Sequence, residues 1–463
     1  MTEQRCTRIV GMAFALLIIG VSLFRWPPVS ASSVGPAALP SETDRAAWFQ
    51  NAKFGMFIHW GPYSLASVEA SWPIMVPGKW GISEAEYTNL YMKFNPVQFD
   101  PKAWVELAQE AGQRYIVFTT KHHDGFCMFD SKLTDYKITR APYGRDVTAM
   151  LAEAARLAGM PLGFYYSPPD MRDPHYRDTT KAVNESWHGD PERPEWAEYL
   201  DYMAGQLREL LTDYGPVAVI WFDGLDCPFK YDPWRMLRLV HQLQPATLVN
   251  DRLGVSGDFG SSAFEQGLPH GIPTQHGTVI PLTFGSRASL SQAPPPAENF
   301  RLWEECMTIN ETWAYNKNDQ QFKSVKQLIQ TLVDVASKGG NFLLDVGPTP
   351  EGTIQPEFAE RLRGIGSWMR VNGDAIYGTT YGPLQNLRFG RTTAKGKTVY
   401  LHVFEWPSSA PLEVPGLSGH ISEVRLLATS EKLEFRQGRS GLTVFLPHSA
   451  PDANDSVIAI EAR

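Results

Sequence analysis

The first three quarters of the chain alternate short apolar runs with longer amphipathic stretches, and this alternation constrains the fold more than any other feature. Seven runs are apolar on both faces, as the buried strands of a parallel sheet are: 54–60, 115–120, 162–166, 217–222, 247–250, 301–308 and 341–346. Helical patterns lie between several of these runs, at 101–111, 146–158, 196–214 and 324–337. Seven or eight strand–helix units close most naturally into a (β/α)8 barrel of the TIM type. A doubly wound open sheet is the alternative, but no GxGxxG motif follows the first strand.

After about residue 377 the pattern changes to short alternating runs such as 398–403 and 442–446, separated by Gly, Pro and Asn. This pattern is typical of antiparallel strands. A chain of 463 residues also exceeds the size at which a single core stops growing, roughly 250–300 residues. We therefore predict a catalytic barrel over residues 45–377 and a C-terminal antiparallel β-sandwich over residues 378–463, to which we assign a packing role.

The first 31 residues have the layout of a secretory signal peptide. Arg5 and Arg8 precede an apolar stretch at 9–24, and the small-residue site Val29-Ser30-Ala31 follows. The apolar stretch is shorter than the about 20 residues that a membrane anchor usually needs. We expect cleavage after Ala31, a mobile leader over residues 32–44, and no stable membrane insertion of the mature chain. The predicted location is therefore outside the cytoplasm: periplasmic, cell-surface or secreted.

Charge and cysteine content exclude several classes of partner. The formal net charge of −8 is mild and no run of Lys or Arg stands out, which argues against nucleic acid as a partner. Cys127, Cys227 and Cys306 remain after the leader, an odd number without CxxC spacing. They indicate neither a zinc site nor a disulfide framework, although one bridge stays open. We predict no cofactor and no metal, and the oligomeric state is left open, a homo-oligomer included.

Polar side chains stand at the C-terminal ends of nearly all the predicted strands, where barrel enzymes build their active sites. In chain order they are His59, then His122, His123 and Asp124, then Tyr166, then Asp223, then Asp251 and Arg252. Because these ends meet at one face of a barrel, the sequence predicts a single site there.

The most informative of these groups is Asp223, which follows Trp221-Phe222 and precedes Gly224. A carboxylate held partly desolvated at a barrel mouth can attack an anomeric carbon, so Asp223 is the predicted nucleophile of a glycoside hydrolase. Such a reaction needs a second carboxyl group that protonates the leaving oxygen. Glu265 and Glu304 are the two candidates.

Five segments together resemble the α-L-fucosidases of glycoside hydrolase family 29. They are FGMFIHWG from residue 54, KHHDGF from 121, YYS from 165, WFDG from 221 and WEECMTIN from 303. The resemblance spans residues 45–377. It implies an exo-acting, retaining α-L-fucosidase that removes terminal fucose from fucosylated glycans by double displacement, through a covalent fucosyl-enzyme on Asp223 and without a cofactor.

The same resemblance implies roles for the residues around the nucleophile. The fucose hydroxyls would be bound by His59, His122, His123, Tyr166 and Arg252. Trp221 and Phe222 would shape the wall near the methyl group, and Glu69 and Trp72 match a Glu-x-x-Trp element that contacts the sugar. Position relative to Asp223 and Arg252 favours Glu265 over Glu304 as the acid/base, although the family commonly shows Thr-Pro-Glu where this chain has Ala263-Phe264-Glu265.

Two other functions stay open. A fucose-binding pseudoenzyme could use the same scaffold, although a binder has no need to keep Asp223. A metal-dependent barrel hydrolase could use His122, His123 and Asp124 as ligands. Adjacent strand residues point to opposite faces, however, so the two histidines need a bend between them to share one ion. The linkage cleaved is also open, because it depends on the long loop at 253–300.

Overall fold

The computed structural model describes residues 42–224, 228–261, 271–273, 279–281, 300–384, 387–408, 411–417 and 419–462. The predicted signal peptide and nearly all of the predicted leader lie outside these residues, and so do Glu265 and Cys227. Among the described residues, no helix combines the length and the apolarity needed to cross a membrane.

Eight parallel strands of the described chain form one sheet in the order β5-β4-β3-β2-β1-β10-β9-β6. A parallel bridge between Asn250 and Phe259 joins its two end strands and closes the barrel. The strands are β1 (Phe54–Ile58), β2 (Ile116–Lys121), β3 (Leu162–Tyr166), β4 (Val219–Phe222), β5 (Leu248–Val249), β6 (Gly260–Ser261), β9 (Trp303–Thr308) and β10 (Asn341–Val346). The predicted barrel is confirmed, and each of the seven predicted runs overlaps a strand.

The eighth strand, β6, lies inside the segment that the sequence indicated as a long loop. It has only two residues, and the short hairpin of β7 (Gly271–Pro273) and β8 (Val279–Pro281) follows it. No helix separates β5 from β6 in the structure. The barrel therefore departs from strict strand–helix alternation at this point.

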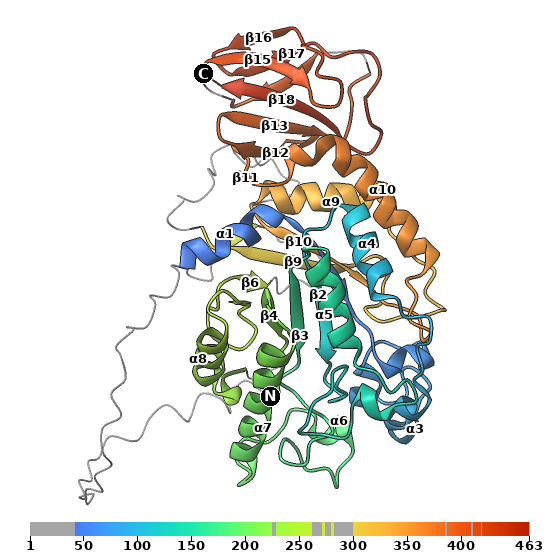
Figure 1. Cartoon of the computed structure of the whole chain (residues 1–463). Helices are drawn as coiled ribbons and strands as arrows, with labels where there is room; N and C mark the ends of the chain where they lie inside the picture. The colour runs from blue at the N-terminus through green and yellow to red at the C-terminus, as the bar shows by residue number, and fades with distance from the viewer. Residues whose placement is uncertain are drawn as a thin grey trace, which may run out of the picture.

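Helices cover the outside of the barrel (Figure 1). The longer ones are α4 (Pro101–Ala111), α5 (Val147–Leu157), α7 (Trp196–Asp213), α8 (Pro233–Leu243), α9 (Val325–Ser337) and α10 (Pro356–Asn372). The shorter ones are α2 (Trp72–Met75), α3 (Glu84–Thr88), α6 (Val183–Ser186) and the 3-10 turns η2 (Pro62–Ala66), η3 (Leu90–Lys93), η4 (Ile138–Arg140), η5 (Pro228–Tyr231) and η7 (Gly373–Ala375). The four predicted helices are present, whereas α8 and α10 were not predicted.

Strand alternation divides the apolar side chains of the barrel into two cores. Ile58, Phe164 and Phe222 belong to the outer core, between the strands and the helices. Phe57, Tyr165 and Trp221 belong to the inner core, which fills the barrel. Helix α1 (Glu42–Ala52), which was not predicted either, contributes Ala46, Phe49 and Ala52 to this inner core. It therefore closes the N-terminal end of the barrel.

The C-terminal module is a sandwich of two antiparallel sheets, as predicted. One sheet has the order β11 (Thr380–Tyr381), β12 (Gly390–Lys395), β13 (Thr398–Val403), β18 (Ser456–Ala462) and β15 (Ile421–Leu426), and the other β14 (Leu412–Pro415), β17 (Gly441–Val444) and β16 (Phe435–Gly438). Side chains of both sheets share one apolar core. The sandwich lies beside α9 and α10 (Figure 1), where the Arg391–Asp334 ion pair joins β12 to α9.

Candidate active site

The candidate site lies within the C-terminal end of the barrel, above the aromatic side chains of the inner core. The ring of Trp221 stacks on that of Tyr165, with centroids 5.7 Å apart, and lies 5.1 Å from that of Phe57. Asp223 and His59 follow these strands two residues beyond Trp221 and Phe57, so they continue on the inner side of the barrel.

Asp223 receives two hydrogen bonds at the mouth of the barrel. Arg252 Nη1 donates to Oδ1 at 3.0 Å, and the Tyr165 hydroxyl donates to Oδ2 at 2.9 Å. Burial alone would raise the pKa of Asp223, but the charge of Arg252 and the Tyr165 hydrogen bond hold this pKa below its usual value. The side chain is 15% exposed. Asp223 is therefore an ionised and accessible carboxylate, which is what a nucleophile requires.

Arg252 is fixed by contacts on three sides. Its guanidinium lies 4.8 Å from the centre of the Trp221 ring, and its Nε donates to Ser261 Oγ at 3.0 Å. The Ser261 hydroxyl in turn donates to Asp251 Oδ1 at 3.0 Å. The short strand β6 thus positions the guanidinium that faces Asp223, and neither Ser261 nor β6 was predicted.

Each of the three predicted histidines is held at Nδ1 by an oxygen atom. The pairs are His59 with Asp345 Oδ1 at 2.7 Å, His122 with Ser71 Oγ at 2.6 Å, and His123 with Ser167 Oγ at 2.7 Å. The rings form one group, because the His122 centroid lies 5.8 Å from that of His59 and 4.2 Å from that of His123. The structure therefore brings these residues together beside Asp223.

Burial keeps the two adjacent histidines neutral. It lowers the pKa of His122 well below its ordinary value and that of His123 to about 4, although the charge of Asp223 acts in the opposite direction on His123. A neutral imidazole has one donor and one acceptor, which suits the hydroxyl groups of a sugar.

A bend at the end of β2 lets consecutive histidines enter the same site. The register between β2 and β3 shifts after Thr119, so that Lys121 pairs with Tyr166. The bend required for the metal alternative is thus present. Within the described ranges, however, no group of three His, Cys, Asp or Glu side chains is arranged to hold a metal ion.

The structure corrects the expectation for Tyr166 and Phe222. The Tyr166 hydroxyl donates to Gln206 Oε1 of α7 at 2.8 Å, and the Tyr166 ring packs edge-on against Phe222 at 6.3 Å in the outer core. Both side chains therefore face the helices and not the interior of the barrel. Their neighbours Tyr165 and Trp221 occupy the inner positions.

Glu69 lies at the edge of the histidine group, and Trp72 opens the short helix α2. Glu69 Oε1 accepts a hydrogen bond from the backbone of Trp313 at 3.0 Å, and the Trp313 ring lies 5.1 Å from that of His59. The second carboxyl oxygen of Glu69 is buried and has no partner among the described residues. Burial raises the pKa of Glu69 to about 7.

Glu304 lies below the site and does not reach it. It stands near the start of β9, is 1% exposed, and accepts hydrogen bonds from the Tyr115 hydroxyl and from Trp221 Nε1, the latter at 2.9 Å. Burial raises its pKa to about 7. Because both carboxyl oxygens already accept hydrogen bonds and the side chain is buried, the geometry does not support Glu304 as the proton donor.

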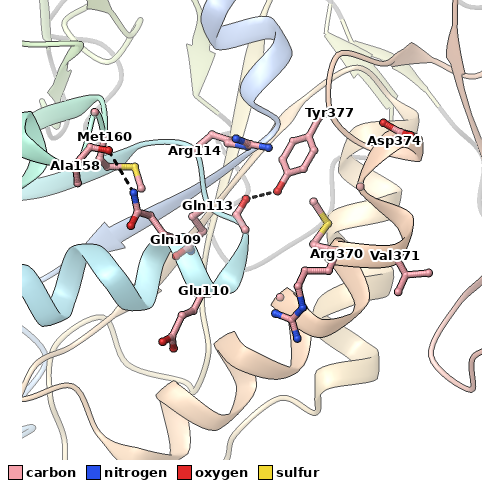
Figure 2. A pocket seen from close by; sticks show the side chains of 15 residues that line it. Gln109, Glu110, Gln113, Arg114, Ala158, Met160, Arg370, Val371, Asp374 and Tyr377 are labelled. Atoms are coloured by element: carbon pink, nitrogen blue, oxygen red, sulfur yellow. Dashed lines mark hydrogen bonds between the residues drawn. The ribbon is translucent and has the colours of Figure 1, made fainter. Parts of the chain in front are cut away.

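A cavity of about 860 Å³ lies at the opposite end of the barrel (Figure 2). It is lined by the ends of α4, α5 and α10, with Arg114 packed over the Tyr377 ring at 4.3 Å. Barrel enzymes carry out their chemistry at the C-terminal ends of the strands. The position of this cavity, before the starts of β2 and β3, therefore separates it from the candidate site.

Comparisons with known proteins agree with this geometry. Residues 36–374 match the α-L-fucosidase family and residues 385–460 match the α-L-fucosidase C-terminal domain. An α-L-fucosidase of Branchiostoma floridae is 30% identical over 87% of this chain and 88% of its own. The tissue α-L-fucosidase of Homo sapiens is 28% identical over 88% of this chain and 86% of its own.

Solved structures give the same result. α-L-Fucosidase isoenzyme 1 from Paenibacillus thiaminolyticus superimposes with a TM-score of 0.80 at 36% identity, over 92% of this chain and 100% of that one. A family 29 α-L-fucosidase of Bacteroides thetaiotaomicron, trapped as a covalent intermediate with 2-fluoro-fucosyl fluoride, superimposes with a TM-score of 0.76 at 27% identity, over 91% and 96% of the two chains. On this evidence the chain belongs to the α-L-fucosidase family of glycoside hydrolases.

Proposed function

We propose that this α-L-fucosidase is exo-acting and retaining, and that it releases terminal fucose from fucosylated glycans through a covalent fucosyl-enzyme on Asp223. The observation that carries the proposal is the ionised, partly exposed carboxylate of Asp223, held by Arg252 and Tyr165 at the mouth of the barrel. The covalent intermediate trapped in the Bacteroides relative supports the same chemistry.

The proposed reaction has two displacements. In the first, Asp223 forms a bond to the anomeric carbon while the bond to the glycan oxygen breaks and an acid donates a proton to that oxygen. In the second, water attacks the anomeric carbon, gives its proton to the same acid/base, and the bond to Asp223 breaks. Fucose is then released with its original anomeric configuration.

We assign the acid/base to Glu265, which lies outside the described residues. The assignment is supported by its neighbour in sequence, Ser261, which hydrogen-bonds to Arg252 beside the nucleophile. Ser261, the last described residue before Glu265, thus lies at the site. His59, His122, His123 and Glu69 are proposed to bind the fucose hydroxyls, with Trp221 forming the apolar wall.

Selectivity is tested by hydrolysis of 4-nitrophenyl α-L-fucoside in parallel with the β-D-galactoside and α-D-glucoside analogues. Retention is tested by proton NMR, which identifies the anomer of the sugar that is released first. We expect selective release from the fucoside and α-L-fucose as the first product. Asp223→Asn should lower kcat by orders of magnitude without loss of the fold. First release of the β anomer would contradict retention. Binding of fucose, with no hydrolysis of either the fucoside or fucosylated oligosaccharides, would favour the pseudoenzyme. Loss of activity on chelation would favour the metal-dependent hydrolase.

We further infer from the layout of residues 5–31 that the enzyme is exported. Expression of the full chain in a bacterial host should yield a mature protein outside the cytoplasm whose N-terminal sequence begins at Ser32. Recovery of the uncleaved chain in the cytoplasm would contradict export.

A further inference from the structure

We propose that Ser167 is a positioning residue that fixes His123 in the tautomer whose proton is on Nδ1. The inference rests on the proposed function only for the role of His123 beside the nucleophile. The tautomer itself follows from the hydrogen bonds of the Ser167 hydroxyl.

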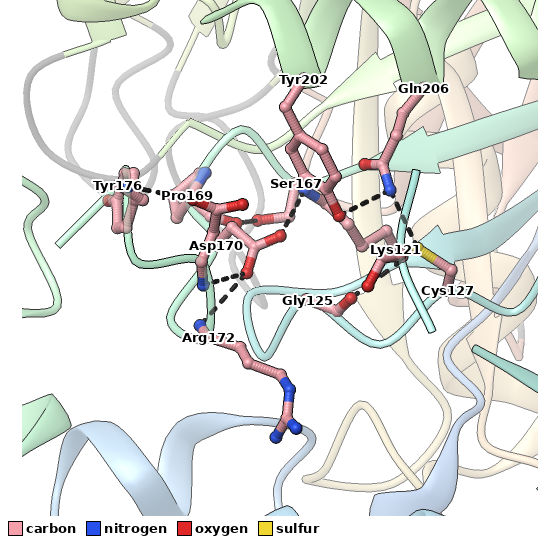
Figure 3. A network of polar contacts seen from close by, with 12 residues as sticks. Lys121, Gly125, Cys127, Ser167, Pro169, Asp170, Arg172, Tyr176, Tyr202 and Gln206 are labelled. Atoms are coloured by element: carbon pink, nitrogen blue, oxygen red, sulfur yellow. Dashed lines mark hydrogen bonds and ion pairs between the residues drawn. The ribbon is translucent and has the colours of Figure 1, made fainter. Parts of the chain in front are cut away.

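The Ser167 hydroxyl makes two hydrogen bonds and has one hydrogen. Its Oγ lies 2.7 Å from the backbone oxygen of Pro169 and 2.7 Å from His123 Nδ1 (Figure 3 shows Ser167 and Pro169). A carbonyl oxygen can only accept, so the hydroxyl donates to Pro169. It must then accept from His123, and Nδ1 must carry the proton. Ser167 is fully buried and His123 is 1% exposed, so bulk water does not compete for these bonds.

The turn that holds Pro169 in place is tied at both ends to one residue, Lys121. The Lys121 carbonyl accepts from the backbone of Ser167 at 3.0 Å, and its ammonium lies 3.1 Å from Asp170 Oδ2 (Figure 3). The backbone of Met171 donates to the His123 carbonyl at 2.8 Å. Two consecutive prolines, Pro168 and Pro169, further restrict the turn. The acceptor for the Ser167 proton is therefore rigid.

A glycine allows this turn to pack closely against the histidine loop. Gly125 has a φ of +79°, which is the left-handed region, and a Cβ built there would lie 2.2 Å from Asp170 Oδ1. A side chain at position 125 would displace Asp170, and with it the turn that carries Pro169.

The fixed tautomer matters because of what His123 faces. Its Nε2 lies 3.5 Å from Asp223 Oδ2. Burial lowers the pKa of His123 to about 4, so at neutral pH the ring is uncharged and Nε2 is a bare acceptor. The other tautomer would place an N–H at Nε2 and donate it to the nucleophile. Ser167 therefore leaves this carboxylate oxygen without a histidine donor and leaves Nε2 to accept from a sugar hydroxyl.

The tautomer can be measured directly in the free enzyme, by nitrogen NMR of the full-length protein labelled in its histidine rings. Loss of signals in His123→Gln assigns the ring of interest. At pH 7 we expect a protonated Nδ1 and a bare Nε2 in the wild type. Ser167→Ala should shift the proton toward Nε2, and Ser167→Thr, which keeps the hydroxyl, should restore the wild-type signals.

Ser337→Ala is the matched control, because Ser337 is also fully buried and its hydroxyl donates to a backbone carbonyl, that of Asp334, at 2.7 Å. It should leave the His123 signals unchanged. A wild-type ring protonated on Nε2, or a Ser167→Ala spectrum identical to that of the wild type, would overturn the inference. If Ser167→Ala fails to fold, the wild-type spectrum alone decides.

Kinetics provide the second measurement. Ser167→Ala should lower kcat/KM for 4-nitrophenyl α-L-fucoside by about tenfold, the effect of one buried hydrogen bond, with kcat reduced more than KM is raised. A purely structural role would give the same loss in Ser167→Thr, which would contradict the proposal. Absence of hydrolysis in the wild type would refute the proposed function, whereas the NMR result would still decide the tautomer.

Discussion

Replacement of Tyr165 by Phe should raise the pKa of Asp223, the proposed nucleophile, without disturbing the barrel. The Tyr165 hydroxyl donates to Asp223 Oδ2 at 2.9 Å, and its ring stacks on Trp221. Phenylalanine keeps the ring and removes only the donor. The hydrogen bond stabilises the ionised form of Asp223, so its loss favours the protonated form.

The size of the effect follows from the charge of the acceptor. A hydrogen bond to a charged group contributes about 1.5–3 kcal/mol, and one pKa unit corresponds to about 1.4 kcal/mol. The pKa of Asp223 should therefore rise by about one to two units. Arg252, which still donates to Oδ1 at 3.0 Å, keeps Asp223 largely ionised at neutral pH. The rate at neutral pH should consequently change much less than the pH profile does.

The assay is the pH dependence of kcat/KM, whose acid limb reports the essential base of the free enzyme. Tyr165→Phe should move this limb to higher pH by about one to two units. Tyr166→Phe is the matched control, because its hydroxyl donates to Gln206 in the outer core, and the limb should stay in place. If the acid limb of the profile did not move in Tyr165→Phe, or moved equally in both variants, the proposed stabilisation of ionised Asp223 by the Tyr165 hydroxyl would be refuted.

Three other predictions test the surroundings of the site. Azide can replace water in the second displacement without the help of a general base. It should therefore restore activity and give fucosyl azide with Glu265→Gln but not with Glu304→Gln. The reverse result would make Glu304 the acid/base. Lys121→Met leaves Asp170 buried without its cation and should lower the free energy of unfolding in urea by about 3–5 kcal/mol. Lys102→Met, which removes the exposed ion pair with Glu106, should change this free energy by less than about 1 kcal/mol, and equal losses in the two variants would contradict the prediction. Burial raises the pKa of Glu69 and Glu304 to about 7, above an unfolded value of about 4.3. The folded state therefore binds more protons than the unfolded state between these pH values, and the urea midpoint should fall as pH rises across them. If Glu304→Gln left the slope of the urea midpoint against pH unchanged, Glu304 would not contribute to this effect.

The strands of the barrel could be predicted because their apolar runs are buried on both sides. The same property hides which residues point inward, since Tyr165-Tyr166 and Trp221-Phe222 are pairs of adjacent aromatic residues without polar alternation. Asp223 and the three histidines could be singled out as candidates because each follows the end of a strand. The histidine partners Ser71, Ser167 and Asp345 come from distant segments, and nothing in the sequence pairs them with particular histidines.

The elements that were missed are those whose local sequence opposes their structure. Strand β6 has two residues, one of them glycine, and it is held by pairing with β9 and by the hydrogen bonds of Ser261 to Asp251 and Arg252. Helix α10 contains Gly364 and Gly366, which lower helix propensity. A Cβ at Gly366 would lie 1.8 Å from the backbone oxygen of Glu110, so this glycine is required by the close packing of α10 on α4. Tertiary contact outweighs propensity in both elements.

The most direct test of the central claim is covalent labelling of Asp223. In 2-fluoro-fucosyl fluoride, the fluorine at carbon 2 slows both displacements because it destabilises positive charge on the sugar. The fluoride leaving group at the anomeric carbon accelerates only the first displacement, so the 2-fluoro-fucosyl-enzyme should accumulate. Mass spectrometry of proteolytic peptides should then find one fluorofucosyl group, on Asp223, and none in Asp223→Asn. A label on another carboxylate, or an active wild-type enzyme that remains unlabelled, would contradict Asp223 as the nucleophile.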